Sequence, residues 1–297
     1  MKATHLKLKE NLGSFAFVLP ALLIFAVFYL YPFFNVFLLS LHEWDGVNPS
    51  QNFVGFTNFV NIVDNDPYFW QSMRQAGYIT LIALVFQNAL ALVLALACDR
   101  AIKRNAVYRV IFFIPPVLSE VVVGIVWKWI FDGNWGLLNN WLNMVGLGRL
   151  AHTWLGDSST ALTCIALVHS WKGFGWGFII LLAGLQAIPT QLYEAAQIDG
   201  AGSWKSIRKV TFPLMIPTFF MVTILTILGS MQVFVLILSM TGGGPGYNTE
   251  VPVTRIIASM LASSRFGYAC AQGIIFGAIL MIVSFIQIRV SKVLTRV

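Results

Sequence analysis

The sequence predicts an all-α, polytopic membrane protein of six transmembrane helices. Hydrophobic residues make up 58% of the 297-residue chain and charged residues only 10%, whereas a soluble domain carries roughly 25% charged residues. Six apolar segments approach the roughly 20 residues that span a bilayer, and one membrane domain over residues 1–297 accounts for the length. The net charge of +7 would suggest nucleic-acid binding in a soluble chain. In a membrane protein it is explained by the topology, so we expect no nucleic-acid partner.

The six apolar segments are taken in order as transmembrane helices. The first is too long for the apolar core of a cleaved signal peptide and lacks a small-residue cleavage site, so we expect it to be retained. The fourth is the weakest because Lys172 lies inside it. The predicted spans are approximately 13–40, 77–98, 108–131, 161–186, 213–239 and 269–290.

Basic residues predict the orientation of these spans, because Lys and Arg concentrate on the cytoplasmic side. With the N-terminus inside, most of the 19 basic residues fall on one side. These residues are Lys2, Lys7, Lys9, Arg100, Lys103, Arg104, Arg109, Lys205, Arg208, Lys209, Arg289, Lys292 and Arg296. Both termini and the loop 189–217 are therefore predicted to be cytoplasmic.

The segments before the fourth span contain several departures from a regular apolar helix. Residues 42–76 are polar and predict a short interfacial element that packs on the outer helix ends. Pro115 and Pro116 predict a break or kink in the third span. Residues 131–142 predict a surface turn and a short outer helix.

The fourth span contains the sequence HSWKGFGWGF, residues 169–178. Its three glycines weaken the helix and allow close approach of another backbone. Polar side chains such as His169 and Lys172 are expensive at membrane depth unless they face protein or water. Two interpretations stay open: an internal hydrogen-bonded cluster, or residues that line a path through the membrane. No second ligand stands at a usable spacing from His169, so we expect no metal site.

The loop 189–217 carries the most specific signal in the chain, and it predicts two short helices joined by a turn. Thr190 is expected to cap the first helix and Ser203 the second. Gly200 or Gly202 is expected to take the left-handed conformation that ends a helix. The second helix is expected to stop before Pro213.

The loop contains a distinctive order of residues: Glu194, Ala195, Ala196, Asp199, Gly200 and Ala201, followed by Thr211, Pro213 and Pro217. In this order it resembles the EAA loop of permease subunits of binding-protein-dependent ABC importers. The order of motifs from Leu185 to Pro217 most resembles the maltose and glycerol-phosphate type permeases of the carbohydrate branch. Ile207 and Val210 depart from the Phe and Ile that the family often has, but both are apolar exchanges.

The resemblance implies that residues 189–217 form a cytoplasmic coupling helix that contacts an ATP-binding subunit. It further implies a permease for a sugar or polyol derivative in a bacterial or archaeal cytoplasmic membrane. The expected partners are an ATPase dimer, a second permease that is usually a homologue, and an extracytoplasmic solute-binding protein. Glu194 is our candidate for a charged contact with the ATPase, and Gly200 for the turn that fixes the lever angle.

Polar residues within the spans are candidates for a substrate path, because amides and hydroxyls match the hydroxyls of a sugar. Most such residues in a bundle instead join helices to one another, and Glu120 and Lys172 are also a possible ion pair. The candidates are Gln87, Asn88, Ser119, Glu120, Lys172, Ser230 and Gln232.

Motifs for chemistry are absent from the chain. No GxxxxGK[ST], GxSxG or HExxH sequence occurs, so we expect no enzyme and no catalytic residue, with ATP and Mg²⁺ bound by the partner ATPase. A glycine-rich stretch after the fifth span, residues 240–250, predicts an irregular outer loop. Gly273 and Gly277 predict a close helix contact in the sixth. The alternatives are an ion-gradient-driven secondary transporter, which needs more intramembrane carboxylates and related halves, and a non-transporting scaffold.

Overall fold

The computed structural model describes residues 15, 17–101 and 106–294. Helices dominate these residues, and the two strands are β1 (His42–Glu43) and β2 (Asn52–Phe53). Contacts divide the chain into two compact units, and α14 (Pro252–Leu261) and α15 (Phe266–Leu294) contribute to both. The expectation of one membrane domain stays a prediction.

Five described helices are long and apolar enough to cross a membrane, and a bent pair adds a sixth. The straight ones are Phe17–Ser40, Pro67–Asp99, Ala161–Gln186, Ser203–Met231 and Phe266–Val293. The bent pair is Val107–Val117 with Glu120–Ile130. This agrees with the predicted polytopic helical class. The basic residues Lys2, Lys7, Lys9, Lys103, Arg104 and Arg296 and the start of the first span lie outside the described residues.

The first unit contains residues up to Asp66 together with Ile256–Phe276. Its N-terminal helix, with the π-helical η1 (Ala26–Leu30) and α2 (Tyr31–Ser40), leads into the β1–β2 hairpin and α3 (Thr57–Asn65). The hairpin is antiparallel, with His42 opposite Phe53. The buried Asn58 amide of α3 donates to the carbonyls of Ser40 at 2.8 Å and His42 at 3.0 Å, which ties α3 to the end of α2. The short element predicted after the first span is therefore present.

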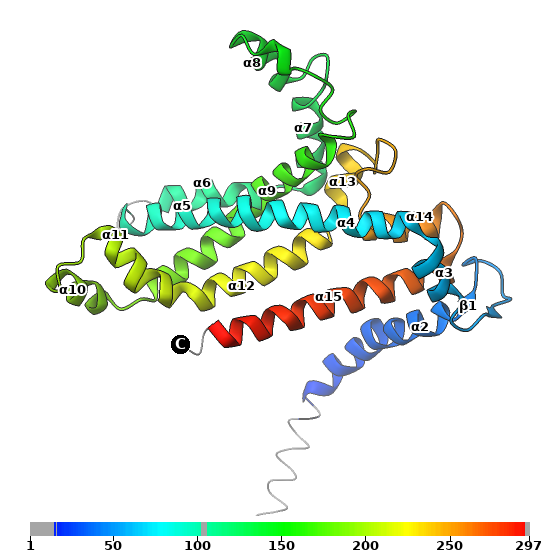
Figure 1. Cartoon of the computed structure of the whole chain (residues 1–297). Coiled ribbons are helices and arrows are strands. Elements are labelled where there is room, and N and C mark those ends of the chain that lie inside the picture. Colours follow the sequence, from blue (N-terminus) through cyan, green and yellow to red (C-terminus); the bar gives the residue numbers. More distant parts are fainter. Residues whose placement is uncertain (1–14, 16, 102–105, 295–297) are drawn as a thin grey trace, which may run out of the picture. The chain divides into compact units, whose positions relative to one another are not determined.

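The second unit contains Pro67–Arg255 and the chain from Gly277 onward. Its central helix is α9 (Ala161–Gln186), which contacts α4 (Pro67–Ile82), α5 (Asn88–Ala101), α6 (Ala106–Val117) and α12 (Phe212–Met231). Figure 1 shows α5, α9 and α12 in this bundle. The apolar core between them includes Phe178, Leu181 and Val222, all buried. The helix of α4 continues into α5 through the π-helical η2 (Ala83–Gln87).

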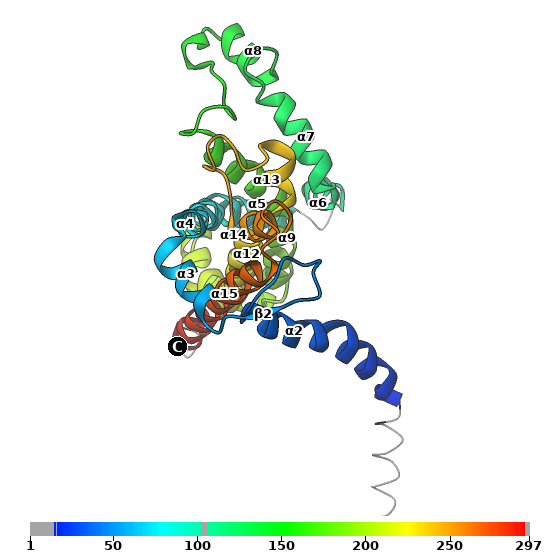
Figure 2. The ribbon, with the colours of Figure 1, turned by 90° about the vertical axis from the view of Figure 1, so that its right-hand side faces the viewer.

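The third span breaks where the two prolines predict. Helix α6 includes Pro115 and Pro116, ends at Val117, and is followed by α7 (Glu120–Ile130) at an angle of 90°. Proline lacks an N–H, so hydrogen bonds of the helix are lost just before the bend. Figure 2 shows α7 turned away from α6, with α8 (Leu137–Met144) beyond it.

The turn between α7 and α8 also matches the sequence prediction. The Asp132 carboxylate accepts the backbone N–H groups of Trp135 at 2.8 Å and Asn134 at 2.9 Å. These two hydrogen bonds lower the pKa of Asp132, because they favour its charged form. The turn and short outer helix are confirmed, and η3 (Gly148–Leu150) follows α8.

The prediction that the helix after Gly202 stops before Pro213 is wrong. Helices α11 (Ser203–Ser206), η4 (Ile207–Thr211) and α12 form one continuous helix through Pro213 and Pro217. The π-helical η4 directly precedes Pro213, and its changed hydrogen-bond register accommodates a residue with no N–H. This helix ends at Met231, and a separate α13 (Val235–Met240) follows.

Candidate functional site

A cavity of about 450 Å³ opens in the second unit between η2, the start of α7, α9 and α12. Most of its lining is apolar, and a few polar side chains project into it. This is the usual character of a small-molecule site. The lining residues are Gln87, Glu120, His169, Lys172, Gly173, Trp176, Gly177, Ile180, Val222, Leu225, Thr226 and Gly229.

One ion pair crosses the break of the third span. The Lys172 Nζ atom of α9 lies 3.8 Å from the Glu120 Oε1 atom at the start of α7. The same Nζ donates to the Pro116 carbonyl of α6 at 3.4 Å. Lys172 therefore contacts both sides of the bend. The possible pairing of Glu120 with Lys172 is confirmed.

A short chain of hydrogen bonds connects η2 and α5 to α12. The Thr226 hydroxyl donates to Asn88 Oδ1 at 2.8 Å and accepts from Gln87 Nε2 at 3.4 Å. Asn88 is almost fully buried, so its amide serves helix packing. The Gln87 Oε1 atom is buried and has no hydrogen-bond partner among the described residues. That oxygen is therefore an unsatisfied hydrogen-bond acceptor at the cavity wall.

His169 belongs to a second polar contact between α9 and α12. Its Nε2 atom lies 3.0 Å from the Ser230 hydroxyl, and Ser230 is fully buried. His169 also lines the cavity. His169 therefore fits both interpretations: it belongs to a hydrogen-bonded cluster, and it lines the cavity.

The glycines of α9 allow the close approach that the sequence predicts. A side chain at Gly173 would meet the Gln87 amide, and one at Gly175 would meet the Phe112 carbonyl and the Pro116 ring. Gly177 faces Ala91 and Val222 in the same way. By contrast, a Cβ at Gly273 or Gly277 of α15 would meet nothing within 4 Å among the described residues. The predicted close contact at those two positions is therefore not found there.

The structure separates the predicted path residues into three groups. Gln87, Glu120 and Lys172 line the cavity, whereas Asn88 and Ser230 are buried behind its surface. Ser119 and Gln232 are exposed at helix ends, as the N-cap of α7 and the C-cap of α12, and are not lining residues.

The sequence analysis did not identify two lining residues that have an aromatic ring or a hydroxyl group. Trp176 is 56% exposed at the cavity and Thr226 is buried at its wall. Both stand in apolar runs, and only their spacing of three to four residues from Gly173 and Val222 could have indicated a shared helix face.

The second predicted site, the loop 189–217, begins with α10 (Thr190–Ile198). No residue of α10 is buried. Glu194 and Ala195 are exposed and Ala196 is half-buried. The Tyr193 hydroxyl lies 3.1 Å from the Thr211 hydroxyl, which ties α10 to η4.

The turn after α10 confirms one prediction and corrects two. Gly200 has φ +72°, the left-handed conformation, between Asp199 and Ala201. The predicted caps are wrong: Pro189 and Gly202 occupy the N-cap positions, and Thr190 and Ser203 are the first helical residues. The backbone of each preceding residue is extended, with ψ 131° at Pro189 and 170° at Gly202, so the helix starts one residue after it.

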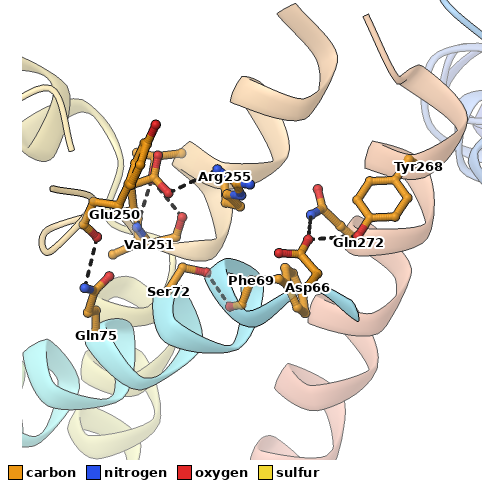
Figure 3. Close-up of polar contacts among 11 residues, drawn as sticks. Asp66, Phe69, Ser72, Gln75, Glu250, Val251, Arg255, Tyr268 and Gln272 are labelled. Carbon is orange, nitrogen blue, oxygen red and sulfur yellow. Dashed lines mark hydrogen bonds and ion pairs between the residues drawn. The ribbon is translucent and has the colours of Figure 1, made fainter. Parts of the chain in front are cut away.

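The loop between α13 and α14 is irregular, as its glycines predict. Gly242, Gly243 and Gly246 have positive φ, and the Thr249 hydroxyl donates to the Gly244 carbonyl at 2.7 Å. Figure 3 shows Glu250, at the end of this loop, beside Arg255 of α14. The Glu250 Oε2 and Arg255 Nη1 atoms form an ion pair at 3.6 Å.

A buried carboxylate in the first unit was not among the predicted site residues. Asp66 accepts hydrogen bonds from the Tyr268 hydroxyl at 2.9 Å and from Gln272 Nε2 at 3.0 Å (Figure 3). These bonds join the residue after α3 to α15. Because the carboxylate is satisfied by two donors, we interpret it as structural.

Known proteins resemble this chain over nearly its whole length. Residues 87–295 match the family described as "Binding-protein-dependent transport system inner membrane component". The "Probable ABC transporter permease protein YurN" of Bacillus subtilis is 32% identical over 286 residues, 96% of this chain and 97% of that protein. The "sn-glycerol-3-phosphate transport system permease protein UgpA" of Agrobacterium fabrum is 30% identical over 275 residues, 92% of each.

A solved structure shares the fold. It is the bacterial alginate ABC transporter in complex with an alginate pentasaccharide-bound periplasmic protein. The TM-score is 0.83 at 24% identity, over 97% of both chains.

Proposed function

The chain belongs to the family of inner-membrane components of binding-protein-dependent transport systems, and on this premise we propose that it is a permease subunit of an ATP-driven importer for a sugar or polyol derivative. The cavity is the observation that carries the proposal. It lies among apolar helices and presents an amide acceptor, hydroxyl and imidazole groups, and the exposed Trp176. Such groups match the hydroxyls and apolar faces of a saccharide.

Relatives support a carbohydrate as the substrate. Besides the glycerol-phosphate permease, they include the "Trehalose/maltose transport system permease protein MalF" of Thermococcus litoralis, 29% identical over 289 residues that cover 97% of each chain. The polar groups of the cavity match a polyhydroxylated ligand.

We propose that α10 is the coupling helix and contacts an ATPase dimer in the cytoplasm. Its exposure along its whole length leaves it free to insert into a partner's cleft. Lys205, Arg208 and Lys209 follow it and are exposed, which supports a cytoplasmic position and cytoplasmic termini. In this proposal Glu194 makes a charged contact with the ATPase, and Gly200 sets the angle between α10 and α11.

The partners of the proposed importer follow from what this chain lacks. It has no P-loop sequence, so ATP and Mg²⁺ belong to the ATPase. In this proposal a second, homologous permease completes the membrane part of the importer, and a solute-binding protein delivers the substrate from outside the cytoplasmic membrane of a bacterium or archaeon.

The test is purification and reconstitution. Gentle detergent extraction of the tagged chain from its native membrane, followed by mass spectrometry, should recover a P-loop ATPase, a second permease and a solute-binding protein. The recovered complex in proteoliposomes should accumulate the saccharide held by that binding protein only when ATP is present. Recovery of the chain alone, with uptake that ends when an ionophore removes the ion gradient, would establish the secondary-transporter alternative.

A further inference from the structure

The charges of the cavity lining cancel. Among the described residues that line it, Glu120 is the carboxylate and Lys172 is the ammonium group. They form the 3.8 Å ion pair, in which the Lys172 side chain is 15% exposed and that of Glu120 is 43% exposed. The lysine is thus the more enclosed partner of the pair, and the carboxylate is the more exposed one.

The remaining polar groups also favour a ligand that donates hydrogen bonds. Gln87 Oε1 is buried at the cavity wall without a partner, and Gln87 as a whole is 7% exposed. An ionised carboxylate or phosphate offers no donor to such an acceptor, and in this cavity it would also face the Glu120 carboxylate.

We propose that Glu120 is a specificity-determining residue: by pairing with Lys172 it keeps the cavity neutral, so that the cavity accepts uncharged saccharides and rejects acidic ones. This inference rests on the proposed function and adds the substrate's charge class to it. Without Glu120, Lys172 becomes an anion-binding group at the cavity wall. Without Lys172, Glu120 makes the cavity attractive to cations.

The experiment measures equilibrium binding to the purified transporter complex in lipid nanodiscs, without the solute-binding protein, so that its specificity does not enter. The probes are three radiolabelled trisaccharides of equal ring number: neutral maltotriose, anionic trigalacturonate and cationic triglucosamine. The variants are Glu120→Gln, Lys172→Met and the double variant. Asp64→Asn is the matched control, because Asp64 is an exposed carboxylate of α3 that is not a lining residue.

Glu120→Gln should bind trigalacturonate about tenfold or more tightly than the wild type, a change of roughly 1.4 kcal/mol. The gain should shrink at high salt, because charge attraction is screened, and it should vanish in the double variant. Asp64→Asn should leave all three affinities unchanged. Lys172→Met should shift preference toward triglucosamine, which provides a second test if Glu120→Gln does not assemble.

Equal trigalacturonate binding in wild type and Glu120→Gln would overturn the inference, as would a gain that survives removal of Lys172. Failure of the proposed function is a separate result. It would appear in the wild-type transport assay as uptake that does not need ATP.

Discussion

Helix α10 exposes every one of its residues at least in part, whereas the helices around the cavity bury polar side chains such as Asn88 and Ser230 against one another. The first region offers contacts to a partner, and the second satisfies its contacts within the chain. Substitutions in α10 and its turn should therefore change coupling without changing stability. Substitutions around the cavity should change stability together with transport.

The largest effect is expected at the turn after α10. Gly200→Val should reduce ATP-driven uptake to background, because a β-branched residue cannot readily adopt φ +72°, so the exposed turn takes another conformation and re-aims α10. ATPase activity should continue without transport. Uptake and ATP hydrolysis are measured in the same proteoliposomes.

Gly202→Val is the matched control for that turn, because Gly202 has φ −66° and open space around it. It should transport nearly as well as the wild type. Normal uptake in Gly200→Val would contradict the proposal that this turn sets the angle of α10. A lower melting temperature of the Gly200→Val complex would contradict the expectation that substitutions in this turn leave stability unchanged.

A smaller effect, on stability, is expected at the contact of α9 with α6. Gly175→Ala should destabilise the complex by about 1–3 kcal/mol, because the added methyl meets the Phe112 carbonyl and the Pro116 ring. Gly77→Ala, where a Cβ meets nothing within 4 Å, should be neutral or stabilise by up to about 1 kcal/mol. Thermal unfolding followed by intrinsic fluorescence distinguishes the two. Equal melting temperatures would contradict the packing described for α9.

The hydrogen-bond chain behind the cavity provides a similar test. Thr226→Val should cost about 1–2 kcal/mol, because it removes a partner from the buried amides of both Gln87 and Asn88. Thr223→Val is the matched control, since the Thr223 hydroxyl donates only to the Phe219 carbonyl of its own helix. Its melting temperature should stay within a degree or two of wild type. A loss as large as that of Thr226→Val would show that the amide network adds nothing.

The smallest expected effect distinguishes a polar residue that lines the cavity from a polar residue that lies at the end of a span outside the lining. Gln87→Ala should lower saccharide uptake about tenfold, the effect of losing roughly 1.4 kcal/mol, because Gln87 lines the cavity. Gln232→Ala should change uptake less than about twofold in the same complex, because Gln232 is an exposed C-cap outside the lining. A path role for Gln232 and Ser119 stays a prediction, and a large loss in Gln232→Ala would support it.

Sequence reasoning predicted the backbone features that are local. The left-handed Gly200, the break at Pro115–Pro116 and the glycine-rich loop all depend on residues next to one another in the chain. Continuation of the helix through Pro213 was missed, because a π-helical turn depends on the hydrogen-bond register and not on composition.

Sequence reasoning predicted only some of the residues that line the cavity. Which side chains face the cavity depends on how each helix is rotated about its own axis. Glu120 and Lys172 are charged in apolar runs, so their pairing could be foreseen. Thr226 could not be distinguished from a threonine that bonds its own helix, as Thr223 does. Ser119 and Gln232 are polar near span ends, but the helix termini turn them away from the lining.

The exposure of the segment around the Gly200 turn also has a consequence for a copy of the chain that has no partner. Ile198 is 88% exposed and Trp204 is 76% exposed, and both flank the Gly200 turn. Under the proposal that α10 contacts an ATPase, these apolar side chains are covered in the assembled transporter and meet water in an unassembled copy. Exposed apolar side chains favour non-specific association, so an unassembled copy should be the more prone to aggregation.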